Sequence, residues 1–258
     1  MKTQGANQRA AAEAWRALGE GRQEPGRVDV LKEDPSTTAV YRLHLRDGTT
    51  TVIAKRSLRS TATVEETVYA KILPILPLRR LHYYGSVAES SGEFCWLFIE
   101  EAHGRSYRPS READRTAAAR WLATLHRSIG EPPAAHLLPA RDSEHYRGLL
   151  RAQRATLLDR VSGPDLHPDE RAALEAVVEH YDQLTARWTE FDEACKVVPY
   201  TLVHGDFINH NVFVRSEESR LVLLPFDWEK AGWGTPAEDW SFSLKNLSRR
   251  TVSHSCSA

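Results

Sequence analysis

The first part of the chain alternates hydrophobic and polar residues with the period of half-buried β-strands. The alternation is clearest at residues 41–46, and the Asp47-Gly48 pair that follows is typical of a hairpin turn. β-branched residues then mark a returning strand at 49–56. Further strands are predicted near residues 28–30, at 83–89 and at 93–100.

Other stretches place their hydrophobic residues at helical spacing, and two of them, 8–18 and 61–73, lie within the β-rich part. Later helices are predicted at 111–128, 143–160 and 167–189, and two short strands at 211–215 and 220–224. The pattern predicts an α+β protein with two lobes. A small β-rich lobe would span residues 1–101, and a larger, mainly helical lobe 102–258.

Composition narrows the class of protein. With 41% hydrophobic and 27% charged residues the chain is ordinary for a globular protein, and its net charge of −1 gives no reason to expect nucleic acid as a partner. No apolar stretch approaches the ~20 residues that span a bilayer. The cysteines, Cys95, Cys195 and Cys256, are odd in number and far apart, with no metal-type pairing. We therefore expect a cytoplasmic protein, either a monomer or a homodimer.

One polar segment has the spacing of a phosphoryl-transfer site. Asp206 follows His204 by two positions and precedes Asn211 by five. This is the spacing of a kinase catalytic loop, in which an Asp orients the attacking hydroxyl and an Asn holds a metal. A zinc site made of His204, Asp206 and His210 is a competing interpretation.

The two short strands predicted after Asn211 would bring a second acid to the same place. If their turn is centred at 217–218, Asn211 lies opposite Leu224. The returning strand would end at Pro225, which cannot donate to an interior ladder. We therefore expect Asn211 and Asp227 to meet, and their side-chain oxygens suit Mg²⁺.

A fixed cation is expected on the strand at 49–56. Lys55 shares a face of this strand with Ile53. If that face lines the cleft between the lobes, Ile53 would cover adenine and Lys55 would reach the phosphates. Glu65 and Glu66, on the next helix, are both candidate counter-ions, and Glu65 is favoured.

Taken together, these residues resemble the aminoglycoside phosphotransferase and choline kinase family, whose fold is protein-kinase-like. The resemblance spans about residues 28–244. The specific matches are His204-Gly205-Asp206 with Asn211, Phe226-Asp227-Trp228-Glu229, and Gly234-Thr235-Pro236-Ala237-Glu238-Asp239. Weaker matches are Lys55, Glu65, the run 96–101 and Leu125-His126.

The resemblance implies roles in catalysis. Asp206 would be the catalytic base or hydroxyl-orienting residue, Asn211 and Asp227 would bind Mg²⁺, and Asp239 would brace the loop. The implied reaction moves the γ-phosphate of ATP, with GTP as the alternative nucleotide, to a hydroxyl of a small molecule. Aminoglycosides, amino alcohols and sugars are the acceptor types that the family suggests. Glu229 is either an acid of the acceptor site or a surface acid.

The resemblance also implies how the nucleotide is held. Lys55 would bind the α- and β-phosphates and Glu65 would hold Lys55, while backbone groups around Glu100 and Ala102 would bind adenine.

Two departures from the family pattern support an alternative function. The turn at residues 34–38, expected to cover the phosphates, has no glycine. Family members usually continue with several helices after the segment that matches 236–240, whereas a short polar tail follows here. The alternative is a nucleotide-binding pseudokinase or an inactive truncated remnant, and a kinase that acts on polypeptides ranks last.

Overall fold

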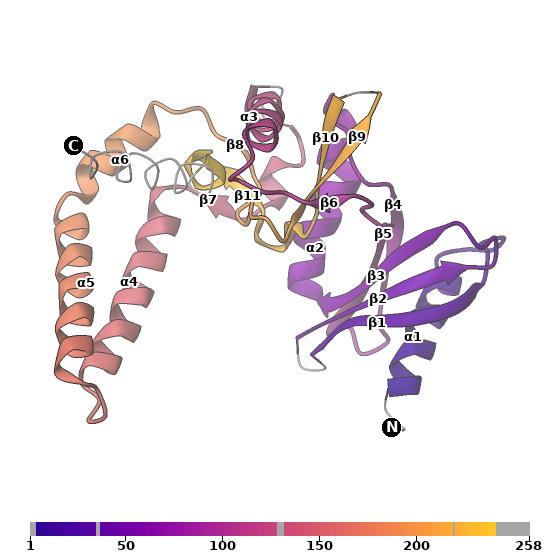
Figure 1. Ribbon diagram of the computed structural model, residues 1–258, viewed down its shortest axis with the longest axis horizontal. Helices are drawn as coiled ribbons and strands as arrows, with labels where there is room; N and C mark the ends of the chain where they lie inside the picture. Colours follow the sequence, from indigo (N-terminus) through magenta and orange to yellow (C-terminus); the bar gives the residue numbers. More distant parts are fainter. Residues whose placement is uncertain (1–3, 35–36, 128–131, 219, 241–258) are drawn as a thin grey trace, which may run out of the picture.

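The structure, a computed structural model, describes residues 4–34, 37–127, 132–218 and 220–240. Its first part is a five-stranded antiparallel sheet in the order β1-β2-β3-β5-β4 (Figure 1). The strands are β1 (Pro25–Asp34), β2 (Thr38–Leu45), β3 (Thr51–Leu58), β4 (Tyr83–Ala88) and β5 (Phe94–Glu100). Buried and half-buried residues alternate strictly along β2, as the hydrophobic pattern predicts.

Helices cover both faces of this sheet. Helix α1 (Gln4–Ala17) packs Trp15 onto the face that carries Phe98. Helix α2 (Arg59–Thr67) continues as a π-helical turn, η1 (Val68–Ile72), and packs on the face that carries Leu97. The predicted helix at 61–73 therefore begins two residues earlier and changes its winding, and a short 3₁₀ turn, η2 (Leu73–Ile75), ends it.

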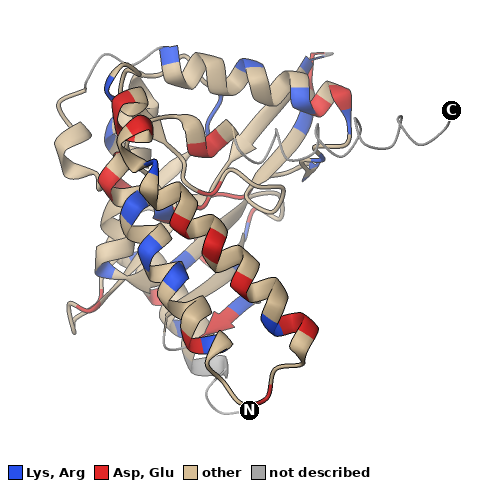
Figure 2. Ribbon diagram, turned by 90° about the vertical axis from the view of Figure 1, so that its left-hand side faces the viewer, with Lys and Arg blue, Asp and Glu red and all other residues tan. Residues whose placement is uncertain are grey.

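The second part is mainly helical. Its helices are α3 (Glu112–Arg127), α4 (Ser143–Val161), α5 (Pro168–Ala186) and α6 (Trp188–Lys196). The single helix predicted at 167–189 was wrong in one respect, because the chain leaves helical geometry at Arg187 and starts again as α6. Helices α4 and α5 lie side by side and project away from the sheet (Figure 1). Most charged residues of α4 are basic and most of those of α5 are acidic (Figure 2), and Arg154 of α4 pairs with Asp182 of α5 at 2.7 Å.

Two small sheets join the helices to the candidate site. The hairpin of β9 (Val212–Glu217) and β10 (Arg220–Pro225) was predicted, and β6 (Arg105–Ser106) extends it. The other sheet has the order β7-β11-β8. Its strands, β7 (Ala140–Arg141), β8 (Thr201–Val203) and β11 (Gly232–Gly234), were not predicted. Strands β8 and β9 hold the two ends of the segment 204–211.

Some sequence-based expectations concern residues that the structure does not describe. Cys95 and Cys195 are buried and free, whereas Cys256 and the tail at 241–258 lie outside the described residues. Residues 35 and 36 of the predicted phosphate-covering turn also lie outside them. None of the described helices combines the length and the apolar composition needed to cross a membrane. The lobe boundary at residue 101 stays a prediction.

Candidate active site

His204 anchors the predicted catalytic loop directly after β8. Its fully buried ring lies 4.3 Å from the ring of Trp228, centroid to centroid. Nε2 is 3.1 Å from the carbonyl oxygen of Phe226, and Nδ1 is 3.3 Å from the backbone nitrogen of Asp206. These partners assign the proton to Nε2, which donates, and leave Nδ1 to accept. Burial lowers the pKa of His204 to about 4, so the ring stays neutral.

These hydrogen bonds exclude the zinc interpretation, because both ring nitrogens of His204 are already engaged within the fold. The ring therefore orients the loop and is not available as a metal ligand.

The carboxylate of Asp239 holds the same loop from the other side. It accepts hydrogen bonds from the backbone N–H groups of His204 and Gly205, at 3.0 and 3.1 Å. Burial raises the pKa of Asp239 to about 7, although these two hydrogen bonds favour the charged form. The bracing geometry agrees with the role that the family resemblance implies.

Gly205 lets the loop approach the chain after Asp227 closely. Its φ is +74°, and a Cβ built on it would lie 2.3 Å from the carbonyl oxygen of Lys230. That carbonyl also accepts two hydrogen bonds from the guanidinium of Arg141, from Nε at 3.0 Å and from Nη2 at 2.6 Å. A larger residue than glycine would therefore push the loop away from a fixed peptide group.

Asp206 and Asn211 lie together, as their spacing suggests. The side-chain nitrogen of Asn211 donates to Oδ2 of Asp206 at 3.1 Å and to its backbone carbonyl at 3.2 Å. Lys230 donates to the same Oδ2 at 2.9 Å. One carboxylate oxygen thus receives two donors, which fixes the carboxylate plane.

The hairpin register differs from the prediction. Leu224 pairs with Phe213 and not with Asn211, because the turn lies one residue further along the chain than expected. The backbone N–H of Phe226 instead donates to the carbonyl oxygen of Asn211 at 2.9 Å. This register places Asp227 directly after the residue that is bonded to Asn211.

Asp227 adopts a left-handed backbone conformation, with φ 65° and ψ 61°. A non-glycine residue in this region costs about 1 kcal/mol or more, and such residues cluster at functional sites. The neighbours on both sides hold it, since Phe226 is bonded to Asn211 and Trp228 is fully buried.

Three carboxylates converge on Lys55. Its Nζ lies 2.5 Å from Glu65, 2.5 Å from Asp227 and 3.0 Å from Glu229. Burial alone would lower the pKa of Lys55, but these carboxylates outweigh it and raise the pKa above its usual value. Burial raises the pKa of Glu65 to about 7, against the attraction of Lys55.

Glu65, and not Glu66, is therefore the partner of Lys55 in the structure. The surface interpretation of Glu229 was wrong, since Glu229 pairs with Lys55 from the short turn η4 (Trp228–Lys230). Its position two residues after Asp227 was the available signal. Oxygens of Glu65, Asp227 and Glu229 lie within 4.8 Å of one another, a donor set that fits a hard cation such as Mg²⁺.

A cavity of about 300 Å³ lies between the first sheet and the β9–β10 hairpin. It is lined by every residue predicted to hold the nucleotide, namely Ile53, Lys55, Glu65, Glu100 and Ala102. Asp227 and Glu229 line it as well.

The cavity extends from the backbone near Glu100 to a charged end at Lys55. Phe213, which was not predicted, and Phe226, which the family match included without a role, line it with their rings 5.3 Å apart in an edge-to-face arrangement. Val52 pairs with Glu100 on β5, and Lys55 lies three residues further along β3, which separates the two ends by about 10 Å. Such a cavity fits a flat apolar base at one end and charged groups at the other.

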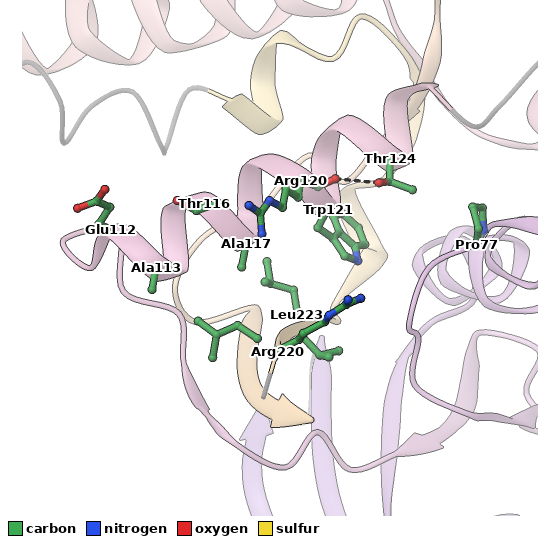
Figure 3. A pocket seen from close by; sticks show the side chains of 12 residues that line it. Pro77, Glu112, Ala113, Thr116, Ala117, Arg120, Trp121, Thr124, Arg220 and Leu223 are labelled. Atoms are coloured by element: carbon green, nitrogen blue, oxygen red, sulfur yellow. Dashed lines mark hydrogen bonds between the residues drawn. The ribbon is translucent and has the colours of Figure 1, made fainter. Parts of the chain in front are cut away.

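A second cavity lies outside this site. It has a volume of about 1080 Å³ and lies between α3 and β10 (Figure 3). Arg120 and Trp121 of α3 and Arg220 and Leu223 of β10 line it. None of the candidate site residues reaches it.

Comparisons with known proteins show the family and the fold of the chain. The model of a family described as "Phosphotransferase enzyme family" matches residues 32–254. A search of curated proteins gave no match. Among solved structures, the GDP and kanamycin complex of APH(2")-IIia is similar with a TM-score of 0.61 at 15% identity, over 93% of this chain and 80% of that one. A thermostable mutant of aminoglycoside phosphotransferase APH(4)-Ia, in a ternary complex with AMP-PNP and hygromycin B, gives 0.56 at 13% identity, over 91% and 81%. The likeness shows the protein-kinase-like fold.

Proposed function

The chain belongs to the phosphotransferase enzyme family, and from that premise we propose that it transfers the γ-phosphate of ATP to a hydroxyl group of a small molecule. One observation carries the proposal. Asp227, one of the three carboxylates around Lys55, directly follows Phe226, whose backbone is bonded to Asn211, and the side chain of Asn211 in turn donates to Asp206. A phosphate-binding cation, metal-binding oxygens and a hydroxyl-orienting carboxylate are the parts that phosphoryl transfer requires.

The nucleotide would bind in the cavity of about 300 Å³. Ile53 from the sheet and Phe213 and Phe226 from the hairpin would enclose the base, and backbone groups around Glu100 and Ala102 would bind its edge. Lys55 would bind the α- and β-phosphates, held in place by Glu65. GTP is the second nucleotide that this arrangement admits.

Asn211 and Asp227 would hold Mg²⁺, and Glu229 adds a third oxygen ligand at the same place. When bound, the ion supplies positive charge to the phosphate oxygens.

Asp206 would orient the acceptor hydroxyl and take its proton. Oδ2 is occupied by Asn211 and Lys230, whereas Oδ1 has no hydrogen-bond partner in the part of the chain that the structure describes. The free oxygen is therefore the one that can accept from a hydroxyl group.

Acids near Asp206 favour an acceptor that carries amino groups. Glu238 is close enough to Asp206 for their charges to repel, and burial raises its pKa. Tyr146 of α4 donates to Glu238 at 3.2 Å. An acid at this place can pair with an ammonium group, as in an aminoglycoside or an amino alcohol, while a neutral sugar is the other acceptor class.

The test is a panel of hydroxylated acceptors incubated with Mg-ATP or Mg-GTP, read by mass spectrometry for the gain of one phosphoryl group. Asp206→Ala should keep Mg-ATP binding and lose transfer by about 10³-fold, because it removes the hydroxyl-orienting group. Retained turnover in this variant would remove Asp206 from the mechanism. Binding of Mg-ATP by the wild type without transfer to any acceptor, or to water, would favour the pseudokinase alternative.

A further inference from the structure

We propose that Lys230 contacts the phosphoryl group while it is transferred, which makes it a further catalytic residue of this site. The proposal rests on the function proposed above and adds a cation on the acceptor side.

The backbone of Lys230 is one of the best-held points of the site. Its carbonyl oxygen accepts two hydrogen bonds from Arg141 and lies against Gly205, where only glycine leaves enough room. The ammonium reaches back from this fixed point to Oδ2 of Asp206 at 2.9 Å. Lys230 therefore extends across the position where the acceptor hydroxyl and the phosphate must meet.

A cation on the acceptor side would add to the positive charge that Lys55 and the proposed Mg²⁺ supply. During transfer, negative charge is spread over the three equatorial oxygens of the phosphoryl group. Lys55 is buried and already faces Glu65, Asp227 and Glu229. Lys230 is 56% exposed and has one carboxylate partner among the described residues, Asp206.

The reaction itself would free Lys230 from Asp206. The acceptor oxygen forms a bond to the γ-phosphorus, and the bond from that phosphorus to the β,γ-bridging oxygen breaks, with its electron pair leaving on the diphosphate. The acceptor proton passes to Asp206, which becomes neutral. Lys230 thereby loses its ion-pair partner at the moment when the phosphoryl oxygens need one, and the ammonium can turn to them.

The experiment compares Lys230→Met and Lys230→Arg with Lys196→Met in the full-length protein. Lys196, on α6, is a matched control because it is 59% exposed and pairs with Glu193 at 2.8 Å, outside the site. The probe is Mg-ADP with and without aluminium fluoride, which mimics the transferring phosphoryl group, and the readout is the thermal shift. ATP turnover is measured in parallel.

We expect Lys230→Met to bind Mg-ADP like the wild type, to lose the additional shift with aluminium fluoride, and to lose about 100-fold in turnover. Lys230→Arg should keep part of the fluoride-dependent shift and part of the turnover. Lys196→Met should match the wild type in both measurements. Unchanged fluoride response and turnover in Lys230→Met would overturn the proposal.

A second background separates contact with phosphate from an effect through Asp206. In Asp206→Asn, adding Lys230→Met should still remove the fluoride-dependent shift. If that shift is then the same with and without Lys230, the lysine acts only by positioning Asp206 and the proposal is wrong. If the wild type fails to bind Mg-ADP, this inference and the proposed function are both wrong. The same holds if the wild type binds Mg-ADP but neither responds to aluminium fluoride nor turns over ATP. A normal wild type with an unaffected Lys230→Met would overturn this inference alone.

Discussion

At the scale of single residues, the site depends on two unusual backbone conformations. Gly205 and Asp227 both have positive φ, and they frame the segment from which Asp206 and Asn211 extend. Glycine enters this region without cost, so Gly205 can be rationalised from its sequence context. An aspartate in this region has no local sequence signal, which is why the conformation of Asp227 could not be predicted.

Gly205→Ala should lower both stability and activity. The new Cβ would meet the carbonyl oxygen of Lys230 at 2.3 Å, so either the loop or that peptide must move. We expect a loss of about 2–3 kcal/mol in unfolding free energy, with a loss of ATP turnover. Chemical denaturation and a turnover assay measure the two effects.

Gly48→Ala is the matched control for Gly205→Ala. Gly48 has nearly the same φ, +75°, but nothing lies within 4 Å of its added Cβ. It should therefore show the backbone strain alone, about 1 kcal/mol, and full turnover. Equal losses in the two variants would mean that the close approach to Lys230 has no energetic effect.

At the scale of elements, the ion pair between Lys55 and Glu65 connects β3 to α2. Glu65→Gln should weaken binding of Mg-AMP-PNP about tenfold, because Lys55 loses the partner that fixes its position. Stability should change little, since Asp227 and Glu229 remain beside the ammonium. Isothermal titration calorimetry measures the affinity.

Glu66→Gln is the control for this element, because the half-buried Glu66 is the neighbouring acid on the same helix. It should bind the nucleotide like the wild type. Equal losses of affinity in the two variants would show that the pairing of Lys55 with Glu65 is not what orders the phosphate end of the cavity.

Elements were predictable where a hydrophobic period repeats. The five strands of the first sheet and helices α1 to α5 each contain several repeats, so the sequence indicated them within a few residues, whereas α6 was not predicted as a separate helix. Strands β6, β7, β8 and β11 contain two or three residues, which is too few to show a period. The turn residues of the β9–β10 hairpin did not specify where the chain reverses, so the predicted register was off.

The candidate site was predicted from the sequence separation of its residues more than from a hydrophobic period. The separation of His204, Asp206 and Asn211 placed them correctly, because the loop that joins β8 to β9 is short. The pairing of Glu229 with Lys55 and the place of Phe213 were not predicted, because both depend on which face of the hairpin meets the first sheet. That relation belongs to tertiary packing and leaves no local pattern.

At the scale of the whole molecule, buried histidines make stability depend on pH. Burial lowers the pKa of His126 to about 4, whereas an exposed histidine titrates near 6.5. Below pH 6.5 the unfolded chain therefore binds a proton that the folded chain does not, and stability falls as the pH falls. Through this histidine, the free energy of unfolding should fall by about 2 kcal/mol between pH 7 and pH 5.

Urea denaturation of His126→Leu at the two pH values tests this expectation. Between pH 7 and pH 5, the free energy of unfolding of His126→Leu should fall by about 2 kcal/mol less than that of the wild type. Glu65, whose pKa burial raises to about 7, acts in the opposite direction, but it is present in both proteins and cancels in the comparison. Asp239, whose pKa burial also raises to about 7, lies 3.7 Å from Nε2 of His126, so the comparison measures the effect of His126 together with its neighbour Asp239. His180→Leu, at an exposed position of α5, should behave like the wild type. The same slope in all three proteins would contradict the expectation.

The carboxylates around Lys55 have a consequence for the order of events at the site. One ammonium faces three carboxyl groups, so the charged end of the cavity keeps a net negative charge. A bare polyphosphate approaching it would be repelled, whereas a polyphosphate that arrives with its counter-ions would not. The charged end of the cavity would thus bind a nucleotide only when bound cations have neutralised the charge of its phosphates.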